Sequence, residues 1–170
     1  MSFLLPFTIV VDPALVTGRR LDELMEILKD LKPILKTIGE TLETEIAQGF
    51  ASRGFGTWAE LSPLTRADRM RQGYGSQPDL VRSGDLRAAL TEADAPGHKF
   101  LVSANEVRVG VYGSVVPYAY WLQRGTPRMP ARLLVQARPE TIDRIVQSIM
   151  EWLGGGPGIR VMAGAPLPVG

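Results

Sequence analysis

The chain has 170 residues, a net charge of +1 and no cysteine. It is 45% hydrophobic and 22% charged, ordinary values for a globular protein, and it is long enough to bury a core. The lack of cysteine excludes disulfides, thiolate metal sites and a cysteine nucleophile, and it is compatible with assembly in a reducing cytoplasm.

The N-terminal residues are apolar but lack the basic region and the cleavage site of a signal peptide. Pro6 and Asp12 also leave this apolar run too short to span a bilayer. We therefore expect a soluble, intracellular product without membrane contact. Within the run, Phe7 to Val11 is rich in β-forming residues and ends at Asp12-Pro13, which predicts an edge strand.

Residues 19–48 carry apolar side chains at the three-four spacing of an amphipathic helix. Asp22 and Glu23 lie in its first turn, where the helix dipole favours acidic side chains. Pro33 must either kink this helix or begin a second one, because it has no N–H to donate to the carbonyl four residues back. The outer face is acidic, and we interpret it as a solvated face: Glu26, Glu40, Glu43 and Glu45.

Residues 49–78 are rich in glycine, serine and proline, and no period persists among them. A loop of about 30 residues inside a compact domain is unusual unless it is functional or becomes ordered on binding. We predict a long loop that orders on assembly. Trp58 and Leu61 either anchor it to the core or fill a pocket of a partner.

Residues 79–90 have the apolar spacing of a short helix, but Gly84 weakens a helix by roughly 1 kcal/mol relative to alanine. A turn at Ser83-Gly84 followed by a second helical turn is the alternative.

Two strands are predicted next, at residues 99–103 and 107–111. Valine alternates with other residues in the second strand at a period of two. The connection from Ala104 to Glu106 is short enough for a hairpin, and Asn105 could adopt a positive φ there.

Two further helices are predicted toward the C-terminus. Pro117 suits the first position of one helix, and Gly125 suits its C-terminal cap. Pro139 begins the last helix in the same way, and Gly154 ends it. The apolar stripe of that helix comprises Ile142, Ile145, Val146, Ile149, Trp152 and Leu153.

The order of the predicted elements groups the strands and does not alternate them with helices. This order predicts an α+β fold, in which a small antiparallel β-sheet packs against a long N-terminal helix and a C-terminal helix. We expect one domain over residues 1–153. Residues 154–170 are a Gly/Pro-rich tail, a composition that normally stays mobile.

The segment from Pro117 to Arg138 concentrates positive charge. Between Tyr112 and Arg138 there is no Asp or Glu, and because the whole chain is only +1, the rest of it carries −3. Such a segment indicates an anion-facing surface or a docking surface for an acidic partner. Its four arginines are Arg124, Arg128, Arg132 and Arg138.

Catalytic and metal-binding patterns are missing from the sequence. His98 follows Gly97 in an expected turn, where we expect it to be exposed. Asp79 and Asp85 are isolated, and no calcium-loop pattern occurs. The glycines after position 153 are not followed by Lys-Ser/Thr, which excludes a phosphate loop. We therefore predict a protein that is not an enzyme and has no cofactor or metal.

Nucleic-acid binding is a serious alternative. Arg66, Arg69 and Arg71, together with the later arginines and their interleaved aromatic residues, could contact phosphates and stack on bases. However, the pI of about 8.1 lies below the value of roughly 9 that dedicated nucleic-acid domains exceed. Arginine outnumbers lysine 15 to 4, which fits bidentate pairing with carboxylates across protein interfaces at least as well.

Five fragments follow one another between residues 20 and 153. They are the long helix ending near Phe50; Trp58-x-x-Leu61-Ser62-x-x-Thr65; Leu80-x-x-Ser83-Gly84-x-Leu86-Arg87; Val107 to Gly110 with Pro117-Tyr118-Ala119…Gln123-x-Gly125; and Met129-Pro130-Ala131-Arg132. In this order they resemble the virion-morphogenesis, or tail-completion, family of tailed bacteriophages. Departures from that family's pattern are Leu133-Leu134-Val135 in place of Pro-Phe-Leu, Leu122 where His is frequent, and the additional C-terminal tail.

The resemblance implies a structural virion protein of the head–tail junction that forms a homo-oligomeric ring, expected to be hexameric. Such a ring makes the tail competent to join the filled head. Its partners would be the head–tail connector and the tail-terminator or tail-tube proteins, with DNA in the channel as a further contact. The alternatives are a DNA-contacting, channel-lining protein and a tail-tube terminator.

We predict that the interface uses residues of the loop and of the basic segment, which would meet the acidic face of the first helix or an acidic partner ring. We expect Tyr118, Trp121 and Leu122 to lie in the core. The predicted interface residues are Trp58, Arg66, Arg69, Arg124, Arg128, Met129, Arg132 and Arg138.

Overall fold

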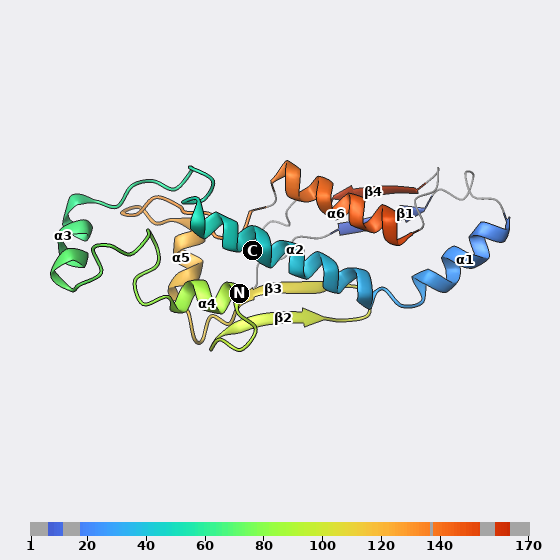
Figure 1. The fold of residues 1–170 in the computed structure, drawn as a ribbon, viewed down its shortest axis with the longest axis horizontal. Helices are drawn as coiled ribbons and strands as arrows, with labels where there is room; N and C mark the ends of the chain where they lie inside the picture. Colours follow the sequence, from blue (N-terminus) through green and yellow to red (C-terminus); the bar gives the residue numbers. More distant parts are fainter. Residues whose placement is uncertain (1–6, 12–17, 137, 154–158, 164–170) are drawn as a thin grey trace. The chain divides into compact units, whose positions relative to one another are not determined.

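The computed structural model describes residues 7–11, 18–136, 138–153 and 159–163. These residues form six helices and four strands, which confirms the predicted α+β class (Figure 1). The strands form two two-stranded sheets, β1 with β4 and β2 with β3.

The described residues group into two compact units. Unit 1 comprises residues 43–100 and 109–136. Unit 2 comprises residues 7–11, 18–42, 101–108, 138–153 and 159–163. The single domain expected over residues 1–153 stays a prediction.

The predicted N-terminal helix is two helices, α1 (Gly18–Leu28) and α2 (Lys32–Ala51). Pro33 begins the second, because the missing N–H costs nothing in a first turn. The inward face of α2 buries Ile34, Ile38, Leu42, Ile46 and Phe50. The acidic face is not uniformly solvated as expected, since the Glu45 side chain is 2% exposed.

In unit 2, β1 (Phe7–Val11) confirms the predicted strand. It pairs antiparallel with β4 (Ile159–Ala163), so that Ile9 lies opposite Val161. Strand β4 lies within the stretch expected to be a Gly/Pro-rich tail, and the other residues of that stretch lie outside those described. The last helix of this unit, α6 (Pro139–Trp152), lies close to β4 and buries Ile145 and Ile149 completely.

Helix α3 (Pro63–Arg71) of unit 1 occupies the middle of the predicted loop at residues 49–78. The Ser62 hydroxyl accepts a hydrogen bond from the Thr65 N–H at 3.1 Å, and Pro63 takes the first helical position. The helix leaves Leu64 and Met70 exposed, so it has no buried apolar stripe whose period would predict it.

Helix α4 (Asp85–Thr91) begins after Gly84, whose φ is 95°, so the alternative with a turn at Ser83-Gly84 is correct. Strands β2 (His98–Val102) and β3 (Val107–Val111) form the predicted hairpin, and the Ser103 N–H donates to the Glu106 carbonyl at 2.9 Å. Asn105 does not adopt the positive φ that we considered for it.

His98 begins β2 and is not in an exposed turn. Its Nε2 lies 3.2 Å from Glu43 Oε1, and its Nδ1 lies 3.2 Å from the carbonyl oxygen of Ala89. The expected exposure is therefore wrong, because the strand carries the imidazole inward against α2 and α4 of the same unit.

Helix α5 (Tyr118–Arg124) ends at Gly125, as predicted, with a φ of 75°. The prediction that its aromatic residues lie in the core is wrong, since Tyr118 and Trp121 are 45% and 53% exposed. The helix is fixed instead by the buried Ala119 and by polar contacts at its C-terminal end.

Candidate functional site

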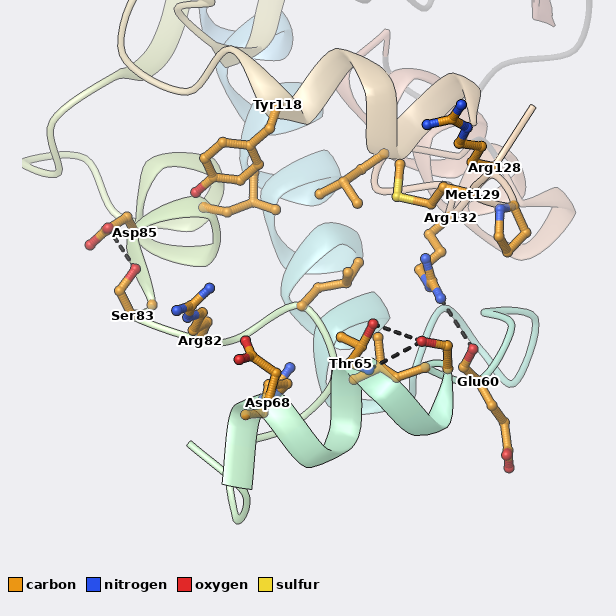
Figure 2. A pocket seen from close by; sticks show the side chains of 18 residues that line it. Glu60, Thr65, Asp68, Arg82, Ser83, Asp85, Tyr118, Arg128, Met129 and Arg132 are labelled. Atoms are coloured by element: carbon orange, nitrogen blue, oxygen red, sulfur yellow. Dashed lines mark hydrogen bonds between the residues drawn. The ribbon is translucent and has the colours of Figure 1, made fainter. Parts of the chain in front are cut away.

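Unit 1 contains a cavity of about 660 Å³ formed by four stretches of the chain (Figure 2). These are the loop and helix around α3, the turn before α4, helix α5, and the segment after it. Much of its lining is apolar: Leu61, Leu80, Leu86, Leu122, Met129 and Pro130.

Arg132 forms part of the cavity wall and is 5% exposed. Its Nε donates to the Ala59 carbonyl at 3.1 Å, and its Nη2 donates to the Glu60 carbonyl at 3.3 Å. Its backbone N–H donates to the Leu122 carbonyl at 2.7 Å. A guanidinium has several donors and can bind backbone carbonyls that form no hydrogen bond within a helix or sheet. Arg132 therefore links α5 to the loop before α3.

Arg69 has a similar structural role on the other side of the cavity. Its Nη2 lies within hydrogen-bonding distance of four backbone carbonyls, the closest being Gln77 at 2.9 Å and Pro78 at 3.0 Å. Because these carbonyls belong to the irregular segment after α3, the buried Arg69 holds that segment against the helix.

Gln123 and Trp58 hold the segment that follows Arg132. The Gln123 Oε1 accepts from the Leu134 and Val135 N–H groups at 2.6 and 3.1 Å, and its Nε2 donates to the Val135 carbonyl at 2.8 Å. The Trp58 Nε1 donates to the Leu133 carbonyl at 3.0 Å. The two side chains thereby pair backbone groups of a segment that belongs to no sheet.

Opposite charges lie at the cavity's edges. Arg128 is exposed, and its guanidinium has no ion-pair partner among the residues described. Asp85 accepts a hydrogen bond from the Ser83 hydroxyl at 2.6 Å and has no cationic partner among those residues. Figure 2 shows Arg128 and Asp85 on opposite sides of the cavity, with Tyr118 between them.

The Tyr118 hydroxyl responds to this environment. Burial, and secondarily the negative charge of Asp85, raise the pKa of Tyr118 above its usual value. The hydroxyl therefore remains a neutral donor at the cavity's edge at physiological pH.

Four of the predicted interface residues line this cavity: Arg69, Arg128, Met129 and Arg132. Arg69 and Arg132, predicted to face a partner, direct their guanidinium groups to backbone carbonyls within the unit. Trp58 lies in the core, which agrees with the anchoring alternative for this side chain, and its ring packs edge-on against Phe50 with centroids 5.4 Å apart.

The other predicted residues lie elsewhere. Arg66 pairs with Glu60 at 2.7 Å on the exposed side of α3. Arg124 is exposed on α5, where its Nη1 donates to the Tyr120 hydroxyl at 2.8 Å. Arg138 belongs to unit 2, at the start of α6, 3.6 Å from Glu140.

Sequence reasoning did not select Asp85 or Tyr118 as site residues. The sequence shows Asp85 as an isolated carboxylate, outside any cluster with metal-ligand spacing. Tyr118 was assigned to the core. Both stand in fragments that the resemblance had marked, which was the available signal.

A second hollow of about 540 Å³ lies in the same unit beside α5 and is lined by Val116, Ala119, Tyr120 and Trp121 among others. Four large side chains are exposed in or near this stretch of the chain: Tyr112, Val115, Tyr118 and Trp121. Exposed apolar groups gathered in this way are typical of interaction surfaces.

The side chains that line the cavity are of several chemical types. Its lining has hydroxyl groups and carboxylates but no histidine. Among the residues described, no group of three His, Asp or Glu could hold a metal ion. In the same residues, no helix has the length and apolarity required to cross a membrane.

Comparisons with known proteins give no relative: no protein-family model matches the sequence, and no curated protein or solved structure does so.

Proposed function

We propose that this chain is a structural virion protein of the head–tail junction of a tailed phage. It assembles as a homo-oligomeric ring that makes the tail competent to join the filled head, and it has no enzymatic role. Its partners are the head–tail connector and the tail-terminator or tail-tube proteins.

One observation carries the proposal: fragments that resemble the tail-completion family meet around one cavity of unit 1. Each of the fragments beginning at Trp58, Leu80, Pro117 and Met129 contributes to the lining. Their shared residues also have physical roles, since Trp58, Gln123 and Arg132 supply the hydrogen bonds that join these stretches. Fragments that are far apart in sequence are thus parts of one structural arrangement, which supports reading them as a common signature.

Gly125 adds a backbone requirement to this arrangement. A Cβ at Gly125 would lie 2.7 Å from the backbone nitrogen of Ala131, and the φ of 75° disfavours other residues. Glycine at position 125 therefore allows the segment from Met129 to Arg132 to pack closely against the end of α5.

A DNA-contacting protein that lines the channel is the alternative. The exposed Arg124, Arg128 and Trp121 favour it, because guanidinium groups and an aromatic face are the means of contacting a nucleic-acid strand. Retention of the purified protein on DNA, lost steeply as salt rises from about 50 to 200 mM, would favour this alternative. The ring proposal expects weak retention that is insensitive to DNA sequence.

Negative-stain electron microscopy of particles made without this gene tests the proposal. Full heads and separate tails of normal length are the expected result. Overlong or variable tails would make the protein a tail terminator instead. Intact, infectious virions would overturn the proposed function.

A charge-reversal test must avoid Arg132. Replacing the buried Arg132 removes hydrogen bonds from the Ala59 and Glu60 carbonyls, so a loss of assembly could result from misfolding. The informative pair is Arg124→Glu with Arg128→Glu, because both side chains are exposed. We expect this variant to fold but not to support joining.

A further inference from the structure

Helix α1 has an exposed ridge that carries a large apolar side chain. Leu24 is buried, while Asp22 and Met25 are exposed three residues apart on one face of the helix, and Lys29, in the turn directly after Leu28, is exposed four residues beyond Met25. Met25 is 58% exposed. The ridge therefore presents an acidic residue, an apolar side chain and a basic residue in that order.

The cavity of unit 1 has the complementary order. Arg128 lies at one edge, many apolar side chains line the interior, and Asp85 lies at the opposite edge, where Arg82 also lines the cavity (Figure 2). Asp22 and Glu23, like Arg128 and Asp85, have no ion-pair partner among the residues described. Lys29 pairs with Glu26 at the exposed end of the same helix, and a surface ion pair of this kind contributes little and can be exchanged. Charged side chains whose signs match across two surfaces are suited to guide docking.

We propose that the α1 ridge of one copy docks into the unit 1 cavity of a neighbouring copy. Met25 enters the apolar interior, Asp22 meets Arg128, and Lys29 approaches Asp85. The eight residues from Asp22 to Lys29 span about 10 Å at the rise of a helix, so the ridge is short enough for one cavity to receive it. This inference rests on the ring assembly proposed above and identifies the two surfaces that would form it.

The contact joins two different surfaces, because the ridge belongs to unit 2 and the cavity to unit 1. In the ring proposed above, each copy presents its cavity and its ridge to different neighbours, which makes the contact heterologous. Repeating such a contact generates a closed ring if the rotation closes, and an open filament if it does not.

The absence of native cysteine allows a direct test. Met25→Cys and Met129→Cys variants of the full chain are purified separately, mixed, and oxidised. We expect a disulfide-linked dimer on a non-reducing gel from the mixture and little from either variant alone. Met70→Cys replaces Met129→Cys in the matched control, because Met70 is exposed on α3 but does not line the cavity.

A charge exchange provides a second test that does not depend on cysteine chemistry. Arg128→Glu should weaken self-association at least about tenfold in analytical ultracentrifugation, and Asp22→Arg should do the same. The two changes together should restore it, because the pair is re-formed with reversed signs. Arg87→Glu is the control, because Arg87 is an exposed cation outside the cavity.

The docking proposal is overturned if Met25→Cys with Met129→Cys gives no more dimer than the control mixture. It is also overturned if the charge exchange fails to restore association. Either failure leaves the proposed function standing when gene-deleted particles still show separate heads and tails. Conversely, the docking would be supported and the proposed function contradicted if the Met25→Cys and Met129→Cys variants cross-link while phage made without the gene still forms normal virions.

Discussion

The indole N–H of Trp58 donates to the carbonyl of Leu133, 75 residues further along the chain, at 3.0 Å. The ring itself is 5% exposed and packs edge-on against Phe50 at the end of α2. One side chain thus fixes the loop before α3 both to a helix and to the segment after α5. The cavity of unit 1 depends on this attachment, because both stretches supply part of its lining.

Replacing Trp58 with Phe should keep most of the packing but leave the Leu133 carbonyl without its partner. The hydrogen bond is partly buried and Leu133 itself is exposed, so the loss is that of one net hydrogen bond, and the free energy of unfolding in urea should fall by about 0.5–1.5 kcal/mol. Trp121→Phe is the matched control, because Trp121 is exposed and the change should stay within about 0.5 kcal/mol. Equal effects at the two positions would contradict the role assigned to Trp58.

Arg132 and Arg128 are four residues apart in the basic segment but have different surroundings. Arg132→Met should destabilise the fold by about 1.5–3 kcal/mol, because the Ala59 and Glu60 carbonyls lose charged donors. Arg128→Met should leave stability nearly unchanged, because its guanidinium is exposed. Urea unfolding of both variants measures the difference. A stable Arg132→Met protein would show that these hydrogen bonds are dispensable.

Gly125→Ala should destabilise the protein by more than about 1 kcal/mol, because the new Cβ would meet the Ala131 backbone at a positive φ. Gly113→Ala is the control, because open space surrounds that position and its φ is not in the left-handed region. Thermal unfolding of the two variants compares them. A tolerated alanine at Gly125 would mean that the segment after α5 can move away.

The pKa of Tyr118 provides a test of the cavity's electrostatics. Asp85→Asn should lower it, although not to its usual value, because burial, the larger cause, remains. Because the raised pKa reflects a penalty on the tyrosinate in the folded state, the folded protein loses stability as the pH rises from the unfolded value of about 10 through the folded value. The tyrosinate absorbance of wild type, with that of Tyr118→Phe subtracted, gives the titration. An unchanged titration midpoint in Asp85→Asn would show that the charge of Asp85 does not raise the pKa of Tyr118.

Local patterns predicted several elements well. The valine alternation of β3 and the proline-led apolar stripe of α6 each predicted an element whose bounds agree closely with the structure. Pro33 and Gly84 were recognised as breaks, and the structure decided between the alternatives stated for each.

The remaining elements depend on distant partners. Strand β4 lies in a Gly/Pro-rich stretch and exists as a strand by pairing with β1, so composition alone did not predict it. Deleting residues 154–170 would therefore remove the strand that pairs with β1. A truncation after Ala163 keeps β4, so it tests the role of the last residues without removing this strand pair.

The candidate site could be predicted only in part, because it too depends on contacts between segments that are distant in sequence. The sequence identified Arg128 and Met129, but not that Arg69 and Arg132 would be buried. Their acceptors are backbone carbonyls of irregular segments, and these carry no residue-specific signal. Arginines used for structure and arginines available to a partner look alike until the backbone around them is known.

The central claim is that this protein joins heads to tails. Its most direct test is to add the purified protein to a phage lysate made without the gene and to count joined particles by electron microscopy. We predict that wild-type protein restores joined particles and that Arg124→Glu with Arg128→Glu, although folded, does not. Full heads and complete tails that stay separate after the wild-type protein is added would contradict the claim.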